Sequence, residues 1–420
     1  METSSLPPQL ERAVIPEPVR EVLTGLATGG FEAFLVGGCV RDLLLGKIPK
    51  DFDIATRALP GDVQKLFRKV IPTGIEHGTV TVLSHGIPVE VTTYRYESGY
   101  EDGRRPTRIE FHHDIEEDLA RRDFTITAIA FNPLTRTLKD PFDGQGDLRA
   151  HVVRCVGVAA ERFGEDGLRA LRAVRIATVL EFVLDSQTEA AIRPAIPVFR
   201  KVALERVHDE FVKLLTARDG ERGLGLLKSS GLLAEFLPEL EPLATDEIFM
   251  DVGRAPRDES VRLAVLLSRF PGPVPILAQL KFPTKVIERV ALLCREPVFP
   301  DWPKRSDAEL RRWMAQLTPA NVPAALAVAR ALGVLQADAL EARARALLDA
   351  DPPLTTKAMA LNGEAMMRLP RHMSCRPSPS SPSPKRAFKV PILSGASLVR
   401  VWLVRATCQS CQALRAARWP

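Results

Sequence analysis

The segment FLVGGCVRDLLLGKIPKDFDIAT (residues 34–56) constrains this 420-residue chain more than any other. Its apolar start ends at Gly37–Gly38, where a turn without side chains lets backbone N–H groups approach a phosphate closely. Arg41 follows one helical turn later and can reach the same anion. Asp51 and Asp53 are two residues apart, which on a strand places both carboxylates on one side, where they can hold divalent metal ions. An isolated D-x-D pair is typical of a solvated turn, but the whole segment predicts a phosphate cradle beside a metal site.

The surrounding residues predict a mixed α/β domain with an antiparallel sheet over residues 21–150. We expect a buried strand at 31–36, a short helix at 39–45 and a second strand at DFDIAT. GTVTVLS and IPVEVTTYR are rich in β-branched residues and are joined by His85–Gly86, which predicts a hairpin. Glu90 interrupts the apolar run of the second hairpin strand. It is either the third carboxylate of the metal site or a side chain on the solvated face of an edge strand.

A helical pattern follows from about residue 160. Leucine- and alanine-rich segments, broken by Pro and Gly at the spacing of helix connections, continue to about residue 350. We expect residues 151–372 to be helical. Residues 373–420 combine a Pro/Ser-rich stretch with a segment that lacks acidic residues. This composition predicts a poorly ordered, atypical basic tail, and a shifted reading frame is our hypothesis for its origin.

Charge and composition narrow the class of protein. The net charge is +5, but residues 373–420 hold eight Lys/Arg and no Asp or Glu, and the rest holds 49 basic and 52 acidic residues. Any RNA site must therefore come from local basic clusters. The start METSSLPPQLER lacks the features of a secretory signal, and no apolar run approaches the roughly 18 residues of a membrane span. Six scattered cysteines indicate reduced thiols, so we expect a cytoplasmic protein that does not bind membranes.

A pair of adjacent arginines forms a second candidate site. Arg121, Arg122 and Asp123 precede the apolar run FTITAIAF. Adjacent guanidinium groups suit an oxyanion because each presents a planar fork of donors. A solvated helix start would give the same pattern, so both interpretations stay open.

A third cluster lies in RFGEDGLRALRAVRIA. Asp166 and Arg169 are three residues apart and share a helical face, which Arg172 and Arg175 extend. An aspartate can accept a hydrogen bond from an exocyclic amine, and an arginine can donate two to ring acceptors. The cluster could therefore select C and A over G and U. An intrahelical ladder of salt bridges is the alternative.

In this order the motifs resemble the signature of the nucleotidyltransferase superfamily that includes tRNA CCA-adding enzymes and bacterial poly(A) polymerases. The matching parts are GG-x-V-R-D, LLG-K-x-P-K-D-F-D-I-A-T, RRDFT and RFGEDGLRALRAVRIA. Two positions depart from the family pattern: Thr127 replaces an asparagine after RRDFT, and Gly167 replaces the usual proline, which predicts a looser helix start. The resemblance covers roughly 30–215, and beyond it only LNGEAMMRL at 361–369 is similar.

The resemblance implies an α+β fold. A polymerase beta-like nucleotidyltransferase head with a mixed or antiparallel sheet (21–150) would precede an all-helical neck with a nucleotide-selecting helix (151–215) and an RNA-binding body (216–372). It implies Asp51, Asp53 and Glu90 as catalytic residues, with Mg²⁺ on Asp51 and Asp53. The implied nucleotide-binding residues are Gly37, Gly38, Arg41, Arg122, Asp123, Asp166, Arg169, Arg172 and Arg175. The loop YEDGRRPTR (100–108) matches a mobile loop associated with A addition, or is a solvated hairpin tip.

We therefore expect a template-independent enzyme that adds or repairs the 3′-terminal CCA of tRNA from CTP and ATP and releases pyrophosphate. A poly(A) polymerase, or an enzyme adding only CC or only A, remains an alternative because the core motifs are shared. A catalytically inactive RNA-binding protein is a further alternative, against which the complete carboxylate set argues. No protein partner is expected. No HD phosphohydrolase activity is expected either, because no histidine lies between residues 209 and 371.

Overall fold

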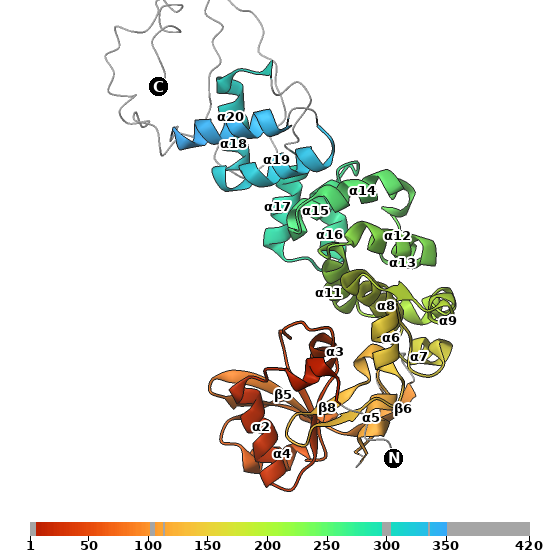
Figure 1. Ribbon diagram of the computed structural model, residues 1–420. Helices are drawn as coiled ribbons and strands as arrows, with labels where there is room; N and C mark the ends of the chain where they lie inside the picture. Colours follow the sequence, from red (N-terminus) through yellow and green to blue (C-terminus); the bar gives the residue numbers. More distant parts are fainter. Residues whose placement is uncertain (1–5, 101–105, 112–113, 296–303, 335–336, 351–420) are drawn as a thin grey trace, which may run out of the picture. The chain divides into compact units, whose positions relative to one another are not determined.

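The computed structural model describes residues 6–100, 106–111, 114–295, 304–334 and 337–350 (Figure 1). It divides into two units, which are considered separately: Met1–Lys304 with Ala320–Glu341, and Arg305–Pro319 with Ala342–Pro420. The expected tail, the segment LNGEAMMRL and residues 101–105 of the expected mobile loop lie outside the described residues.

A seven-stranded mixed sheet forms the base of the first unit, in the order β3-β4-β5-β2-β1-β8-β9. Strands β2 and β5 pair in parallel, and the other neighbours pair antiparallel. The sheet strands are β1 (Ala33–Val36), β2 (Asp53–Thr56), β3 (Val70–Gly74), β4 (Thr79–Ser84), β5 (Ile87–Thr93), β8 (Ala130–Asn132) and β9 (Thr137–Lys139), and a separate antiparallel pair is β6 (Arg95–Tyr100) with β7 (Pro106–Phe111). The expected mixed sheet is confirmed.

The turn between β4 and β5 fixes the register that matters for the site. His85 and Gly86 have φ values of 51° and 78°. Positive φ at both central residues is typical of two-residue hairpins, whose twist matches that of the strands. The turn pairs Ser84 with Ile87, and the same strand β5 then aligns Glu90 with Asp53 of β2.

Helices cover the sheet because each offers it an apolar stripe. Helix α2 buries Val19, Val22, Leu23 and Leu26, a spacing of three and four residues that defines one helical face. It packs on β1, β4 and β5, with α4 beside it (Figure 1). The helices of this part are α1 (Pro8–Glu11), α2 (Glu17–Thr28), α3 (Gly38–Leu44), α4 (Pro60–Leu66), α5 (Ile115–Ala120) and α6 (Gly144–Ala150), with 3-10 turns η1 (Ile75–His77) and η2 (Thr125–Thr127).

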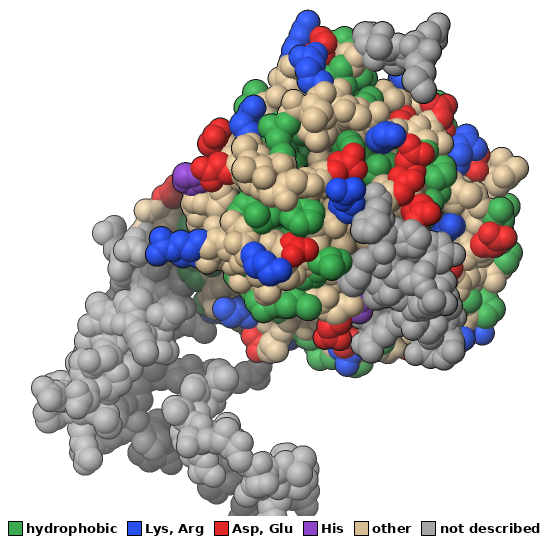
Figure 2. All heavy atoms as spheres, turned by 90° about the horizontal axis from the view of Figure 1, so that it is seen from below, with side chains coloured by type: hydrophobic (Ala, Val, Ile, Leu, Met, Phe, Trp, Pro, Cys, Tyr) green, Lys and Arg blue, Asp and Glu red, His purple; other side chains and the backbone are tan. Residues whose placement is uncertain are grey.

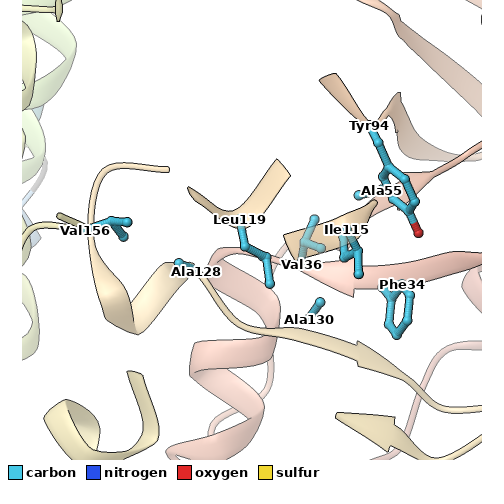
Figure 3. Packing of buried hydrophobic residues seen from close by; sticks show 9 residues of the cluster. All are labelled: Phe34, Val36, Ala55, Tyr94, Ile115, Leu119, Ala128, Ala130 and Val156. Atoms are coloured by element: carbon cyan, nitrogen blue, oxygen red, sulfur yellow. The ribbon is translucent and has the colours of Figure 1, made fainter. Parts of the chain in front are cut away.

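A hydrophobic cluster fixes the strands that carry the site. Phe34 and Val36 of β1 lie close to Tyr94, with Ile115 and Leu119 of α5 packed beside them (Figure 3). All five side chains are at most 3% exposed. Their burial, worth roughly 1.5–3 kcal/mol for a large apolar side chain, holds β1 and α5 together. The segments that follow β1 and α5 both reach the pocket described below.

Helices follow the sheet, as expected, apart from one parallel pair of two-residue strands, β10 (Val152–Val153) with β11 (Val183–Leu184). The helices are α7 (Ala159–Glu165), α8 (Leu168–Leu180), α9 (Ser186–Ala190), α10 (Ile196–Phe199), α11 (Leu204–Leu215), α12 (Gly220–Ser230), α13 (Leu232–Phe236), α14 (Asp246–Arg254), α15 (Glu259–Leu266), α16 (Pro273–Gln279), α17 (Thr284–Arg295), α18 (Asp307–Leu317), α19 (Val322–Ala331) and α20 (Ala337–Asp349), with 3-10 turns η3 (Arg193–Ala195), η4 (Glu241–Leu243) and η6 (Pro319–Asn321). Helix α18 of the second unit begins with a capping box made by Ser306 and Glu309.

Gly167 separates α7 from α8, and its surroundings correct our expectation of a loose helix start. A Cβ atom at this position would lie 2.5 Å from the backbone nitrogen of Phe199 and 2.6 Å from the carbonyl carbon of Val198. Backbone atoms cannot yield as the end of a flexible side chain can. The glycine therefore allows α8 to begin in close contact with α10.

Charged side chains of both signs cover the outer surface. On the face seen in Figure 2, Lys and Arg lie among Asp and Glu, with hydrophobic side chains between them. That face therefore carries no continuous basic field. Among the described residues, no helix is both long enough and apolar enough to cross a bilayer.

Adding a methyl group at Gly167 should destabilise the fold. Gly167→Ala forces the α8–α10 contact apart, and overpacking of this kind costs about 1–3 kcal/mol. Gly164→Ala is the matched control, because no atom lies within 4 Å of the added methyl group inside helix α7. Alanine there should be neutral or stabilising by about 0.5–1 kcal/mol. Urea unfolding of both variants measures the difference, and equal stability would contradict a tight contact at Gly167.

Candidate active site

Most of the predicted site residues surround one pocket of about 390 Å³ in the first unit. Its wall contains seven arginines and three carboxylates, so positive charge dominates a cavity large enough for a small anionic ligand. The arginines are Arg41, Arg95, Arg121, Arg122, Arg169, Arg172 and Arg175, and the carboxylates are Asp53, Glu90 and Asp123.

The glycine turn brings backbone and guanidinium groups together at one end of the pocket. Gly37 follows β1 with a φ of 75°, a conformation that glycine adopts without strain. A Cβ atom there would lie 3.0 Å from Nη1 of Arg122, so the absence of a side chain also lets Arg122 approach. Gly38 begins α3, and Arg41 lies one turn later in the pocket wall with its Nε 2.8 Å from Oδ1 of Asp42. The cradle therefore has the predicted components.

Asp53 and Glu90 are register partners on the parallel strands β2 and β5, and both line the pocket. Burial raises the pKa of Asp53, and neighbouring Asp51 raises it further while Arg122 opposes the shift. Partial burial and then the charge of Asp53 raise the pKa of Glu90, whose side chain is otherwise exposed. The pairing favours the catalytic interpretation of Glu90 over a solvated edge position, since β5 lies inside the sheet.

Asp51 does not lie on the same strand as Asp53, contrary to the prediction from their spacing. Strand β2 begins at Asp53, so Asp51 lies in the preceding irregular segment, where it is exposed and is not part of the pocket wall. It is nevertheless close enough to affect the pKa of Asp53. The two carboxylates therefore flank the pocket edge, with Asp53 inside and Asp51 outside.

These carboxylates fit a divalent cation supported by the substrate. In the part of the chain that the structure describes, no three or more His, Cys, Asp or Glu side chains are arranged to hold a metal by themselves. Mg²⁺ is typically bound by one or two carboxylates together with substrate phosphates and water. Burial and, to a lesser extent, neighbouring carboxylates raise the pKa values of Asp53 and Glu90, and a cation there would favour their charged forms.

Helix α8 provides three pocket arginines on one face through the spacing 169, 172 and 175. Asp123 lies between the first two: Arg169 Nε is 2.8 Å from its Oδ1 and Arg172 Nε is 2.6 Å from its Oδ2. Glu210 of α11, which is 5% exposed, accepts from Arg175 Nε at 2.7 Å and also contacts Arg172. Burial alone would raise the pKa of Asp123, but Arg172 and Arg169 hold it below its ordinary value. The cluster fixes the direction of all three guanidinium groups.

A second buried carboxylate orients the adjacent arginines. Asp118 of α5 is 1% exposed, with its Oδ1 2.7 Å from Arg121 Nη2 and its Oδ2 3.2 Å from Arg122 Nη2. Burial favours the neutral acid, but Arg121 and Arg122 outweigh it and hold the pKa of Asp118 below its ordinary value. Nε of Arg122 is buried and has no hydrogen-bond partner among the described residues. These arginines do not form the solvated helix start that was the alternative.

Asp166 does not share a helical face with Arg169 as expected. It follows α7 in an extended conformation, and its Oδ1 accepts from the backbone N–H of Leu168 at 3.0 Å. Arg206 of α11 holds the same carboxylate, with Nη2 2.5 Å from Oδ2. Arg169 instead bonds to Asp123, to Glu165 and to the carbonyl oxygens of Arg162 and Arg121. The structure therefore brings Arg169, Arg172 and Arg175 into the pocket and leaves Asp166 outside its wall.

Sequence reasoning missed Asp118, Glu210 and Arg206. For Asp118 the signal was present, because it precedes Arg121 and Arg122 by three and four residues at the end of a helix. For Glu210 and Arg206 no local spacing could reveal a partner about forty residues away. Cys39, by contrast, needs no catalytic role: burial raises its pKa to about 11, which keeps the thiol neutral.

Comparison with known proteins identifies the family. The Poly A polymerase head domain matches residues 33–154, and the probable RNA and SrmB-binding site of polymerase A matches residues 181–243. The crystal structure of the Bacillus stearothermophilus CCA-adding enzyme in complex with CTP superposes with a TM-score of 0.73 at 32% identity, covering 84% of this chain and 88% of that one. The chain belongs to the family of CCA-adding enzymes and bacterial poly(A) polymerases.

Curated members of the family agree. The CCA-adding enzyme of Lactobacillus delbrueckii subsp. bulgaricus is 45% identical over 251 residues, which is 59% of this chain and 63% of that protein. The enzyme of Latilactobacillus sakei subsp. sakei is 47% identical over 219 residues, 52% of this chain and 55% of that protein. The chain thus spans 55% to 63% of the length of these curated relatives.

Removing the charge of Asp123 should destabilise the protein and make its free energy of unfolding less dependent on pH in the acidic range. Asp123→Asn leaves Arg169 and Arg172 without their shared anion, at a cost of about 1–3 kcal/mol. Because the pKa of Asp123 is lower in the folded chain than in the unfolded chain, where it is about 3.9, its carboxylate stabilises the fold at pH values above that unfolded pKa. This contribution is lost as the pH falls through the folded pKa. Unfolding between pH 7 and 3 should therefore show a shallower acid decline in the variant.

The control for this measurement is Asp62→Asn, which breaks the exposed pair of Asp62 with Lys65. Such surface pairs contribute about 0–1 kcal/mol. If both variants lost equal stability at neutral pH, the Asp123 cluster would have no special structural weight.

Proposed function

We propose that this chain is a template-independent nucleotidyltransferase that adds or repairs the 3′-terminal CCA of tRNA from CTP and ATP. The observation that carries the proposal is the pocket itself. Seven arginines surround a cavity whose edge holds the aligned carboxylates Asp53 and Glu90. This is the chemistry of a site that binds a triphosphate and activates a hydroxyl group beside it.

The arginines and the glycine turn are assigned to the triphosphate. Gly37 and Gly38 let the phosphates approach the backbone, while Arg41 and Arg122 supply charge at the same end of the pocket. Their role is to neutralise the negative charge that develops on pyrophosphate as it leaves. Because Asp118 fixes Arg122 in advance, little reorganisation is needed during the reaction.

The carboxylates are assigned to the reacting hydroxyl group. Asp51, Asp53 and Glu90 would hold Mg²⁺, which when bound supplies Lewis-acid stabilisation of the oxygens around the α-phosphorus. The bond from the RNA 3′-oxygen to the α-phosphorus forms as the bond to pyrophosphate breaks, and the hydroxyl proton is released. Asp53 and Glu90 position these atoms at the pocket edge, so no cysteine or serine nucleophile is required.

Base selection is assigned to the start of α8. Arg169, Arg172 and Arg175 are held in fixed directions by Asp123 and Glu210, which suits donors that must recognise one edge of a base. Asp166 would join them as an acceptor by exchanging its bond to Arg206 for one to the base. The helices over 181–243, which match the RNA-binding family region, are assigned to tRNA.

A cytoplasmic location goes with this proposal. Cys39, Cys155 and Cys294 are free thiols in the described part of the chain, which fits a reducing compartment.

One incorporation assay separates this proposal from its relatives. Purified protein receives tRNA lacking its CCA end, with CTP, ATP, UTP or GTP alone and with CTP and ATP together. Addition of CCA only with both nucleotides supports the proposal. A long A tail from ATP would support a poly(A) polymerase, and arrest after CC or addition of a single A to a CC end would support a partial enzyme. No incorporation with Mg²⁺ present would favour an RNA-binding protein.

Replacing Asp53 should separate activity from stability. Asp53→Asn removes a metal-binding charge and should lower the incorporation rate by at least roughly 10²-fold. It should also raise the free energy of unfolding at neutral pH without added metal, because burial and Asp51 both disfavour the native charge. Single-turnover incorporation and urea unfolding measure the two effects. Near-normal turnover with Mg²⁺ would exclude Asp53 from catalysis.

Replacing Asp166 should relax base choice more than it slows transfer. Asp166→Ala removes the proposed acceptor, and one specific base contact is worth about 1–3 kcal/mol of discrimination, or roughly 5- to 150-fold. Incorporation of all four nucleotides is compared with that of Arg206→Ala, which frees the Asp166 carboxylate but keeps it. Unchanged preference for C and A in Asp166→Ala would reduce the residue to its structural bond with Arg206.

A further inference from the structure

A second concavity, of about 580 Å³, lies next to the active site along the chain. Helix α1 and the segment after it form one wall, and the loop between α3 and β2 forms the other. We call it the Ile48 groove; its wall includes Arg12, Val14, Leu43, Lys47, Ile48 and Pro49. Pro49 precedes Asp51 by two residues, so the groove wall lies within about 7 Å of the Asp51 backbone.

The groove exposes apolar side chains that the fold does not use. Ile48 is 93% exposed and Val14 is 84% exposed, the two highest values among the large hydrophobic side chains of the described residues. Both border the same concavity. Exposed apolar side chains that gather at a groove indicate a surface that is covered by a ligand.

Basic side chains complete the groove. Arg12 and Lys47 line the groove, and Lys50 directly follows Pro49 of its wall. All three are exposed, and none of them forms a side-chain hydrogen bond or ion pair with another described residue. Of the acids near them in sequence, Glu11 pairs with Arg136 and Asp42 pairs with Arg41, while Asp51 directly follows Lys50. Apolar contacts flanked by unpaired cations suit a nucleic-acid strand, because bases offer apolar faces and phosphates offer charge.

The position of Asp51 indicates the side from which the RNA hydroxyl group can reach the carboxylates. Asp53 faces the arginine pocket assigned to the nucleotide, whereas Asp51 is exposed outside it. The attacking hydroxyl group must reach the same carboxylates from a direction that the nucleotide leaves free. The groove wall ends at Pro49, two residues before Asp51, so an RNA end bound in the groove would lie close to this carboxylate.

We propose that the Ile48 groove binds the single-stranded 3′ end of the RNA substrate, with a base against Val14 and Ile48 and phosphates at Arg12, Lys47 and Lys50. This inference rests on the proposed function and extends it to the second substrate. A second copy of the chain fits less well, because an isologous contact through this groove would bring Arg12 and Lys47 of one copy close to the same two cations of the other.

The test compares two RNA probes on the full chain without nucleotide. One is a tRNA with its single-stranded 3′ end, and the other is the same tRNA with that end removed. Ile48→Ser should weaken binding of the first probe about tenfold and leave the second unchanged, since only the first reaches the groove. Lys47→Ala should reduce the dependence of log Kd on log salt by about 0.7 for the first probe only.

Ile87→Ser and Lys69→Ala are the matched controls, since both residues are exposed on the head and lie outside the groove. The proposal is overturned if Ile48→Ser binds each probe as tightly as the wild-type chain does. It is also overturned if Ile48→Ser weakens the binding of both probes equally. A change in oligomeric state of Ile48→Ser, with RNA binding intact, would assign the groove to a protein contact instead. If the wild-type chain shows the 3′-end dependence but incorporates no nucleotide, the groove stands and the proposed function fails.

Discussion

The shared carboxylate of Asp123 is the interaction on which the site depends. It lies in the segment after α5 and binds Arg169 and Arg172 of α8 through its two oxygens. One residue later, Phe124 bridges to Cys155, which leads into the helices. The bonds of Asp123 therefore join the segment after α5 to helix α8 and orient two arginines of the pocket. Without Asp123, Arg169 would keep Glu165 and two carbonyl oxygens and Arg172 would keep Glu210, but the two guanidinium groups would lose the anion that they share.

An excess of arginine has a structural cost that the carboxylates reduce only in part. Asp118, Asp123 and Glu210 each serve two arginines, so these three carboxylates alone offset only part of the charge of the five arginines that they contact. Taking charged groups out of water is unfavourable unless their partners are well placed. The remaining charge is the part of the site that an anionic ligand completes. Binding and stability are thus coupled, since a polyanion that binds only the folded chain stabilises it.

The local sequence pattern was sufficient to predict strands of the sheet and the residues of their turns that lie at the pocket. The strand at 31–36, the glycine turn, the short helix and the His85–Gly86 hairpin follow from apolar runs and turn residues that act over a few positions. Glu90 could be proposed from one polar residue in an apolar strand, but its alignment with Asp53 depends on a parallel pairing between distant segments. Gly37, Gly38, Arg41 and Asp53 belong to these motifs and line the pocket, whereas Asp51 lies outside its wall.

The rest was beyond local pattern because it depends on contacts between distant segments. Spacing placed Asp166 beside Arg169, yet the chain breaks between α7 and α8 at Gly167, and Asp166 bonds to Arg206 instead. At this break Gly167 packs against the backbone of Val198 and Phe199, a contact that the pattern of the segment itself does not reveal. Gly167 stands where the family usually has proline, and this suggested a loose start of α8, because proline restricts the backbone. In this fold the glycine acts through the volume that it leaves free, and α8 is fixed by contact rather than by its own first turn.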